Sequence, residues 1–194
     1  MNRKLSKSFY QRPAEQIARD LLGKYLVHNT PEGTMSGQIA DVEAYPAFSD
    51  DCSHGNRRTA RTEVMYGEGG HAYIYLVYGI HYQFAIVVNR KGIPEVVFIR
   101  AVVPEEGVDL MRRNFQRKVK HVRDLTKSPG NLCKSFGISL EHYGDDLTAA
   151  SLFLENRGVE IADEDVVAAV RVGIKPTRKG SQRKLRFTVR PNPT

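Results

Sequence analysis

Runs of apolar residues separated by polar turns divide the chain into expected strands and helices. The strongest β pattern covers 71–79 and 81–89, two closely spaced runs rich in Tyr, Ile and Val. We expect further strands at 25–28, 37–45, 95–103, 151–155 and 184–190. Helical patterns are expected at 13–22, 105–115 and 131–136, the first with Pro13 in its opening turn and Gly23 after its end.

Runs of strands with helices before and after them predict an α+β fold with a largely antiparallel sheet. No linker divides the chain, so we expect a single domain over residues 1–194, of which 1–10 form a loose basic segment. The polar stretch 46–70 has little periodicity. We expect it to be a long loop, and such loops in compact domains are usually functional or disordered.

Composition narrows the function classes. The 194 residues include 29 Lys+Arg against 22 Asp+Glu, giving a net charge of +7, and 41% are hydrophobic. That is an ordinary content for a globular core, and no apolar run approaches the roughly 20 residues of a membrane span. The basic N-terminus has no apolar segment behind it, and the two cysteines, Cys52 and Cys133, form no paired motif. We therefore expect a cytoplasmic protein with no signal or targeting segment.

The basic residues are clustered. Residues 171–194 hold eight Lys or Arg and no acid, residues 112–127 hold seven against Asp124 alone, and Arg57, Arg58 and Arg61 form a third group. A single cluster is usually a solvated face, but three clusters favour binding to a polyphosphate.

Glu43 and Tyr45 are the first candidates for chemistry. Strand alternation puts both on one face and Val42 and Ala44 on the other, just ahead of the long polar loop. A carboxylate beside an aromatic ring at a strand end is a typical site layout. The alternative is an edge-strand Glu in solvent beside a half-buried Tyr.

The run Asp50-Asp51-Cys52-Ser53-His54 invites a metal interpretation. A structural zinc site requires four ligands, usually from two paired clusters, and no second cluster follows in the sequence. The sequence therefore predicts no metal site. His54 is more plausibly a ring that stacks or hydrogen-bonds, or simply a loop residue.

Aromatic residues and one arginine mark the central strands. Tyr73 and Tyr75 share a strand face, while Tyr78 precedes Gly79 at a turn. Such tyrosines usually pack with a polar tip exposed, but in a basic protein they also stack on bases or wedge between base pairs. Arg100 lies inside an apolar strand and should pair with an acid or face a site.

These blocks, in this order, resemble the alkyladenine DNA glycosylase family, also called the mammalian-type 3-methyladenine DNA glycosylases. The resemblance runs from about Pro13 to Val189. It is carried by GQIADVEAY, Ser53-His54, Thr59-Ala60-Arg61, GGHAYIYLVYGIHY, FIRAVVP, SPGNLC and VAAVRVGI. It implies a compact fold around a curved antiparallel sheet, damaged double-stranded DNA as partner, and no metal or organic cofactor.

The resemblance also implies residue roles. Glu43 matches the base that activates the attacking water, and Arg100 and the Val172 backbone carbonyl match the groups that hold this water. The rings that sandwich the flipped base in this family are matched here by Tyr45, His54 and Tyr75. Tyr73 matches a supporting residue of the pocket. Tyr78 matches the side chain inserted through the minor groove. Phosphate contacts are expected from the arginines at 57, 58 and 61.

The implied activity is monofunctional excision of alkylated or deaminated purines, namely 3-methyladenine, 7-methylguanine and hypoxanthine, in base excision repair. Arg100 beside Glu43 would favour the ionised carboxylate. Ala85 replaces the Asn common on the family's pocket floor, which predicts weaker discrimination against guanine-type bases. The missing Pro in Thr59-Ala60-Arg61 is expected to change only the loop.

Two other functions fit parts of the pattern. One is a non-catalytic nucleic-acid-binding module, and the other is a bifunctional glycosylase/lyase that uses a Lys Schiff base. No Lys falls in the pocket blocks, which argues against the lyase. We expect a monomer, because nothing in the sequence indicates a larger assembly. Nothing in it indicates an obligate protein partner either.

Overall fold

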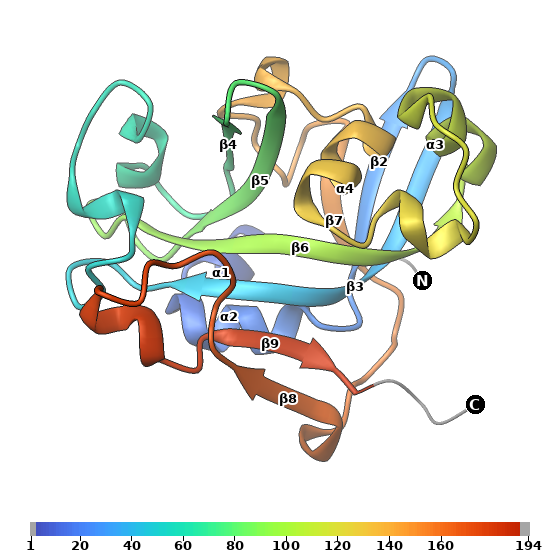
Figure 1. Ribbon diagram of the computed structural model, residues 1–194. Coiled ribbons are helices and arrows are strands. Elements are labelled where there is room, and N and C mark those ends of the chain that lie inside the picture. The colour runs from blue at the N-terminus through green and yellow to red at the C-terminus, as the bar shows by residue number, and fades with distance from the viewer. Residues whose placement is uncertain (1–2, 191–194) are drawn as a thin grey trace.

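Antiparallel pairing joins nine strands into one curved sheet in the computed structural model, which describes residues 3–190 (Figure 1). The strands are β1 (Arg3–Lys4), β2 (Tyr25–Thr30), β3 (Gly33–Tyr45), β4 (Ala72–Val77), β5 (His81–Val88), β6 (Glu95–Glu106), β7 (Leu152–Asn156), β8 (Val166–Ala169) and β9 (Arg186–Val189). The order across the sheet is β1-β7-β2-β3-β6-β5-β4, with β9 paired to β3 and β8 paired to β9. The predicted α+β fold with a mostly antiparallel sheet is confirmed.

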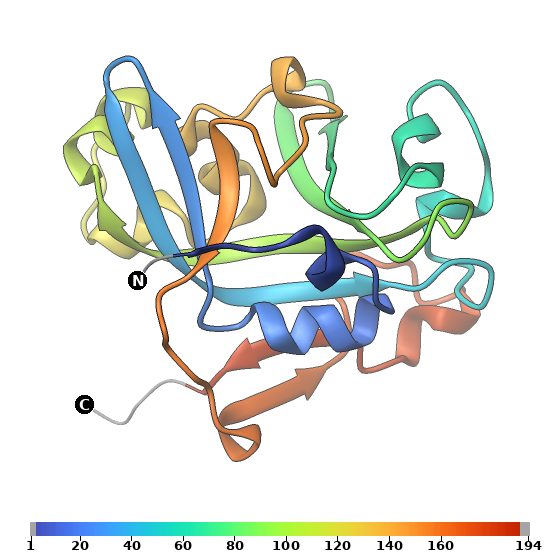
Figure 2. The same ribbon diagram turned by 180° about the vertical axis from the view of Figure 1, so that it is seen from behind.

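Helices cover both sides of this sheet. They are α1 (Lys7–Tyr10), α2 (Ala14–Leu21), α3 (Val108–Phe115) and α4 (Pro129–Phe136). Single 3₁₀ turns occur at η1 (His54–Asn56), η2 (Glu63–Tyr66), η3 (Val122–Leu125), η4 (Leu140–His142), η5 (Asp163–Asp165) and η6 (Lys179–Gln182). The first two helices lie behind β3 in Figure 1 and in front of it in the reverse view of Figure 2, whereas α3 and α4 lie on the other side. Among residues 3–190, no helix is long and apolar enough to cross a membrane.

The central strands β4, β5 and β6 bury both of their faces, which explains why their sequence is almost continuously apolar. Ile74, Phe84 and Ile99 point into the principal core, which also receives α2, α3 and α4. On the opposite face, Tyr73 and Phe98 belong to a smaller cluster that Tyr45 and Tyr75 pack against. This smaller cluster supports the candidate site.

Two expectations from the sequence are wrong, and one strand was missed. Residues 3–10 are not loose, because β1 pairs with β7 at the sheet edge and Tyr10 is fully buried; residues 1–2 lie outside the described part. Residues 105–106 continue β6, and α3 starts only after Gly107, whose φ of 70° suits glycine at this turn. The short strand β8 was not expected, and it forms where Val166–Ala169 pairs with β9.

Two histidines fasten η4 to the sheet. The Nδ1 atom of the buried His28 lies 2.7 Å from the Phe136 carbonyl and therefore donates to it. In His142, Nδ1 accepts the Ser139 backbone N–H at 3.3 Å, and its Nε2 lies 3.2 Å from Nε2 of His28. This chain is satisfied with both rings neutral and one proton between the two Nε2 atoms.

The histidine pair makes stability depend on pH. Burial lowers the pKa of His28 below its ordinary value of 6.5. The unfolded chain therefore binds a proton more readily than the folded chain, and stability is lost as pH falls through 6.5. We expect the free energy of unfolding to drop more between pH 7.5 and 5.5 in the wild type than in His28→Gln, by up to about 1 kcal/mol. Urea unfolding at both pH values measures this, and equal drops would contradict the assignment.

Candidate active site

A cavity of about 590 Å³ opens between β4–β6, the loop at 46–61 and the C-terminal loop at 171–174. Most of the candidate residues line it: Tyr45, His54, Arg61, Tyr73, Tyr75, Tyr78, Ala85, Arg100 and Val172. The fold thus brings together residues that are up to 127 positions apart in the sequence.

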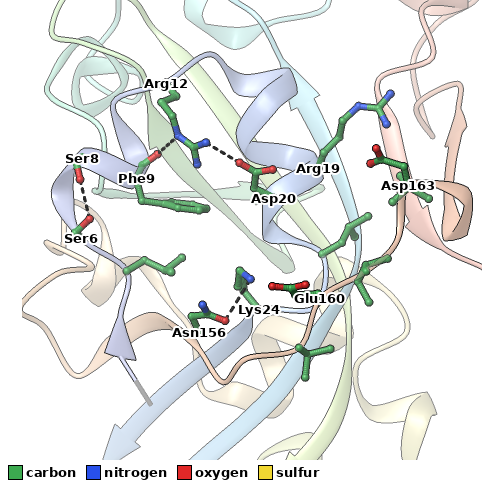
Figure 3. Close-up of a pocket in the computed structure, with 15 residues that line it drawn as sticks. Ser6, Ser8, Phe9, Arg12, Arg19, Asp20, Lys24, Asn156, Glu160 and Asp163 are labelled. Carbon is green, nitrogen blue, oxygen red and sulfur yellow. Dashed lines mark hydrogen bonds and ion pairs between the residues drawn. The ribbon is translucent and has the colours of Figure 1, made fainter. Parts of the chain in front are cut away.

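A second cavity of about 680 Å³ lies between the N-terminal segment, α2 and the loop that follows β7 (Figure 3). Of its charged groups, Arg12 and Asp20 form an ion pair at 2.6 Å, and Lys24 donates to the Asn156 side chain at 3.2 Å. None of the sequence-predicted site residues lines it, so the ring-lined cavity is the candidate active site.

Glu43 has no solvent exposure and does not itself line the cavity, but it bonds to three residues that do. Its Oε1 accepts the Val172 backbone N–H at 2.8 Å and faces Arg100 Nη1 at 3.0 Å. The Tyr45 hydroxyl donates to Oε2 at 2.8 Å. Glu43 is therefore not an edge residue in solvent, and its Oε2 retains acceptor capacity for one more hydrogen bond.

Two β-bulges aim the charged groups at this point. Ile39 pairs with Val102 and Asp41 with Ala101, so Ala40 is an extra residue in β3. The next pair joins Val42 to Ile99, which makes Arg100 the extra residue in β6. Bulges shift the alternation of a strand and redirect its side chains. As a result Asp41, Glu43 and Tyr45 face away from the principal core, while Ile39, Val42 and Ala44 face into it.

The pKa of Glu43 is raised above its ordinary value, because burial outweighs the attraction of Arg100 and the hydrogen bonds from Val172 and Tyr45. The sequence led us to expect Arg100 to dominate and to favour ionisation. Arg100 does act in that direction, but complete desolvation of the carboxylate is the larger effect.

Three rings of the cavity wall, those of His54, Tyr73 and Tyr75, pack against one another. Tyr73 and Tyr75 stack at 5.0 Å between centroids, and His54 meets Tyr75 edge-on at 5.0 Å and 81°. His54 Nδ1 lies 3.1 Å from the Tyr73 hydroxyl. Desolvation and the nearby Arg61 lower the pKa of His54, so its ring is neutral at pH 7. A flat base between His54 and Tyr75 would require the His54 ring to turn.

A buried ion pair fixes the wall of the cavity. Arg171 donates to both oxygens of Asp50, to the Ala44 carbonyl at 3.0 Å and to the Gly180 carbonyl at 3.1 Å, and both charged side chains are fully buried. Its guanidinium lies 4.5 Å over the Tyr45 ring. Arg171, counted from the sequence among the phosphate-binding cations, is therefore unavailable to a ligand, and it fixes the backbone that presents the next residue to Glu43.

The acidic run Asp50-Asp51 of the 46–70 loop also binds the C-terminal segment that forms this wall of the cavity. Both Asp51 oxygens accept backbone N–H groups, from Lys179 at 2.9 Å and Gly180 at 2.8 Å. Asp50, Asp51 and Cys52 thus offer ligand atoms close to one another, but the two carboxylates already accept from Arg171 and from the Lys179 and Gly180 N–H groups. Burial and the Asp50 charge raise the pKa of Cys52 to about 11, so it is a thiol at neutral pH.

Tyr78 stands at the tip of the β4–β5 hairpin with 90% of its surface exposed. Positive φ angles of 53° at Tyr78 and 72° at Gly79 are those of the tight turn that suits a twisted hairpin. Positive φ is strained for a tyrosine, so this turn holds the ring out at the mouth of the cavity at some cost in stability.

The three arginines of the 46–70 loop have different surroundings. Arg61 is exposed and lines the cavity, and Arg57 is exposed on the same loop. Arg58 is exposed but pairs with Glu63, its Nε donating to Oε2 at 2.9 Å. A phosphate would have to compete with Glu63 for Arg58.

The sequence assigned no site role to Asp41 or Arg186, and it marked Asp50 only as part of a run that was weighed as a metal site. Asp41 lies two residues before Glu43 on the same strand face, which was a usable signal. No pattern in the sequence reveals that Asp50 meets Arg171, because the partners are 121 positions apart.

A buried carboxylate bonded to the wall of a ring-lined cavity, which an exposed tyrosine and an exposed arginine also line, fits an enzyme that acts on a nucleic acid base. The model of the methylpurine-DNA glycosylase (MPG) family matches residues 8–193, and the chain belongs to this family. It is a DNA-3-methyladenine glycosylase by class, which confirms the family resemblance expected from the sequence.

Curated bacterial proteins cover almost the whole chain. The chain is 38% identical over 192 residues to one from Natranaerobius thermophilus, covering 98% of this chain and 97% of the other. It is 41% identical over 191 residues to one from Oceanobacillus iheyensis, covering 97% and 93%. Both relatives are named for 3-methyladenine DNA glycosylase activity.

Removing one acid of the loop should test the buried ion pair. Asp50→Ala leaves the Arg171 charge buried without a partner, and we expect it to lower the free energy of unfolding by about 3–5 kcal/mol. Asp51→Ala removes only hydrogen bonds at the surface and should cost clearly less. Chemical denaturation of both variants measures the difference, and equal losses would contradict the role assigned to Asp50.

Proposed function

We propose that this glycosylase is monofunctional and excises 3-methyladenine, 7-methylguanine and hypoxanthine from duplex DNA by attack of a water molecule that Glu43 activates. The observation that carries the proposal is the fully buried Glu43, held by three residues that line the ring-lined cavity, with acceptor capacity remaining on Oε2.

The chemistry requires a base and charge stabilisation at one point. As the bond between the sugar and the base breaks, its electrons leave with the purine and the sugar becomes oxocarbenium-like. The water oxygen bonds to the sugar carbon, and its proton passes to Glu43. A carboxylate whose pKa is raised by burial is a stronger base than one in water, and its negative charge stabilises the sugar cation.

The expected roles of the neighbouring residues fit this step. Arg100, 3.0 Å from Oε1, favours the ionised form of the carboxylate and lines the cavity where the water would bind. Val172 contacts Glu43 through its backbone N–H, and its carbonyl remains the proposed second acceptor for the water.

Tyr45, His54, Tyr73 and Tyr75 are proposed to hold the flipped purine. Electron-rich rings favour a cationic alkylated purine over a normal base. The positive charge also makes that purine a better leaving group, whereas neutral hypoxanthine must first be protonated.

Extraction of the base from the duplex costs a few kcal/mol of stacking and pairing. We propose that Tyr78 fills the space that the flipped nucleotide leaves, and that Arg57, Arg58 and Arg61 contact phosphates near the cavity mouth. Ring insertion and phosphate contacts offset the cost of flipping, and affinity should fall steeply with salt.

A lyase reaction needs an amine near the sugar. The described residues that line the cavity include no lysine, which supports hydrolysis by water instead.

Glu43→Gln keeps the shape and most hydrogen bonds of Glu43 but removes its basicity. We expect base release from 3-methyladenine DNA to fall by about 100- to 10,000-fold while binding to the lesion duplex is retained. Single-turnover release and a binding titration measure the two effects. Glu160→Gln, on the other cavity, is the matched control and should release base at the wild-type rate. Wild-type release by Glu43→Gln would rule out the proposed base, and binding without release in the wild type would favour a pure binding module.

Ala85 lies opposite Tyr73 in the β4–β5 ladder and is only 1% exposed, so a larger side chain there must enter the cavity. We expect Ala85→Asn to lower excision of 7-methylguanine relative to hypoxanthine, because the amide would obstruct the 2-amino group of guanine. Ala85→Ser, which is too short to do so, should leave the ratio near that of the wild type. An unchanged ratio in Ala85→Asn would contradict the prediction.

A further inference from the structure

Four charged side chains of alternating sign form a row beside the cavity. Arg186 donates to both Asp41 oxygens, from Nε at 3.0 Å and from Nη2 at 2.7 Å. Next to Asp41 lies Arg100, with its Nε 3.6 Å from Asp41 Oδ2. The other end of the Arg100 guanidinium, Nη1, lies 3.0 Å from Glu43 Oε1.

The fold builds this row from three strands. The two bulges place Asp41 and Arg100 on the cavity side of β3 and β6. Strand β9 pairs with β3 only at Asp41–Glu43, where Arg186 lies opposite Glu43. The Arg186 side chain nevertheless reaches diagonally to Asp41, a distance that a long side chain spans.

Arg100 is shared between two carboxylates. Its Nε is buried and makes no hydrogen bond among the described residues, and it faces Asp41 at a distance slightly too long for one. A small rotation of the guanidinium would bring it closer to Asp41 and weaken its contact with Glu43. Arg186 opposes this rotation, because it already occupies both Asp41 oxygens.

We propose that Asp41 and Arg186 are positioning residues that balance Arg100 against the Glu43 carboxylate and so set how readily Glu43 takes up the proton of the attacking water. The inference rests on the proposed role of Glu43 as the base. Neither positioning residue has to touch the DNA.

The groups that face Glu43 come from every neighbouring element. They are Asp41 and Tyr45 on its own strand, Arg100 on β6, the Val172 N–H of the C-terminal loop, Arg186 on β9 and, through its field, Tyr75 on β4. Among them Asp41 raises the pKa of Glu43 and Arg100 lowers it. Of the charged groups among them, Asp41 and Arg186 can be changed without removing a direct hydrogen-bond partner of the carboxylate.

The two positions predict opposite effects on the pH profile. Asp41→Asn removes a negative charge near Glu43, so that Arg100 interacts with Glu43 alone. Both effects lower the pKa of Glu43, and the acid limb of base release should move to lower pH by about 0.5 to 1 unit. In Arg186→Gln, Asp41 is free to draw Arg100 away, so the limb should move up by a similar amount. The double variant should lie between them, and all three should release base more slowly than the wild type at its optimum.

Single-turnover release of base from 3-methyladenine DNA across pH 4.5–8 measures the limbs, with circular dichroism at each pH to verify folding. Arg186→Lys keeps a cation beside Asp41 and should restore the wild-type limb. Shifts of the two single variants in the same direction, or limbs that stay in place while only the rate falls, would overturn the proposal. Failure of the proposed base is distinct: Glu43→Gln would then retain the wild-type rate, wherever the variant limbs lie.

Discussion

The burial of a single negative charge at Glu43 is the constraint on which the rest of the site depends. A carboxylate without solvent exposure is strongly unfavourable unless charge and hydrogen bonds compensate it. Here Arg100, the Tyr45 hydroxyl and the Val172 N–H provide that compensation from three separate parts of the chain. Desolvation still prevails and keeps the pKa of Glu43 raised, while Arg100 and the two hydrogen bonds act in the opposite direction.

Each compensating group needs its own support. The bulge in β6 redirects Arg100, and the bulge in β3 turns Glu43 and Tyr45 towards the cavity. Val172 belongs to a loop without regular structure, and it is held by the buried contact between Arg171 and Asp50. The buried Asp50–Arg171 ion pair and two β-bulges of the sheet therefore all help to hold one carboxylate in place.

The sequence predicted the elements whose signal is local. The strands around Glu43 and Tyr75 and helix α2 follow from hydrophobic patterning and end signals, and the family blocks pointed to most of the residues that line the cavity. Long-range interactions were not accessible. Arg171 looked like one more cation in a basic tail, because the burial that pairs it with Asp50 exists only after folding. Residues 3–10 are likewise held by the pairing of β1 with the edge strand β7 and by the burial of Tyr10, and no local sequence pattern indicates either contact.

The most direct test of this account is the acid limb of single-turnover base release from 3-methyladenine DNA, whose lesion is already cationic and needs no proton to leave. Release should decline tenfold per pH unit below a midpoint above 4.5, the ordinary pKa of a glutamate. The slow residual release by Glu43→Gln should lack this limb. A wild-type rate that stays level down to pH 4.5, or the same limb in Glu43→Gln, would contradict the claim that a desolvated Glu43 is the base.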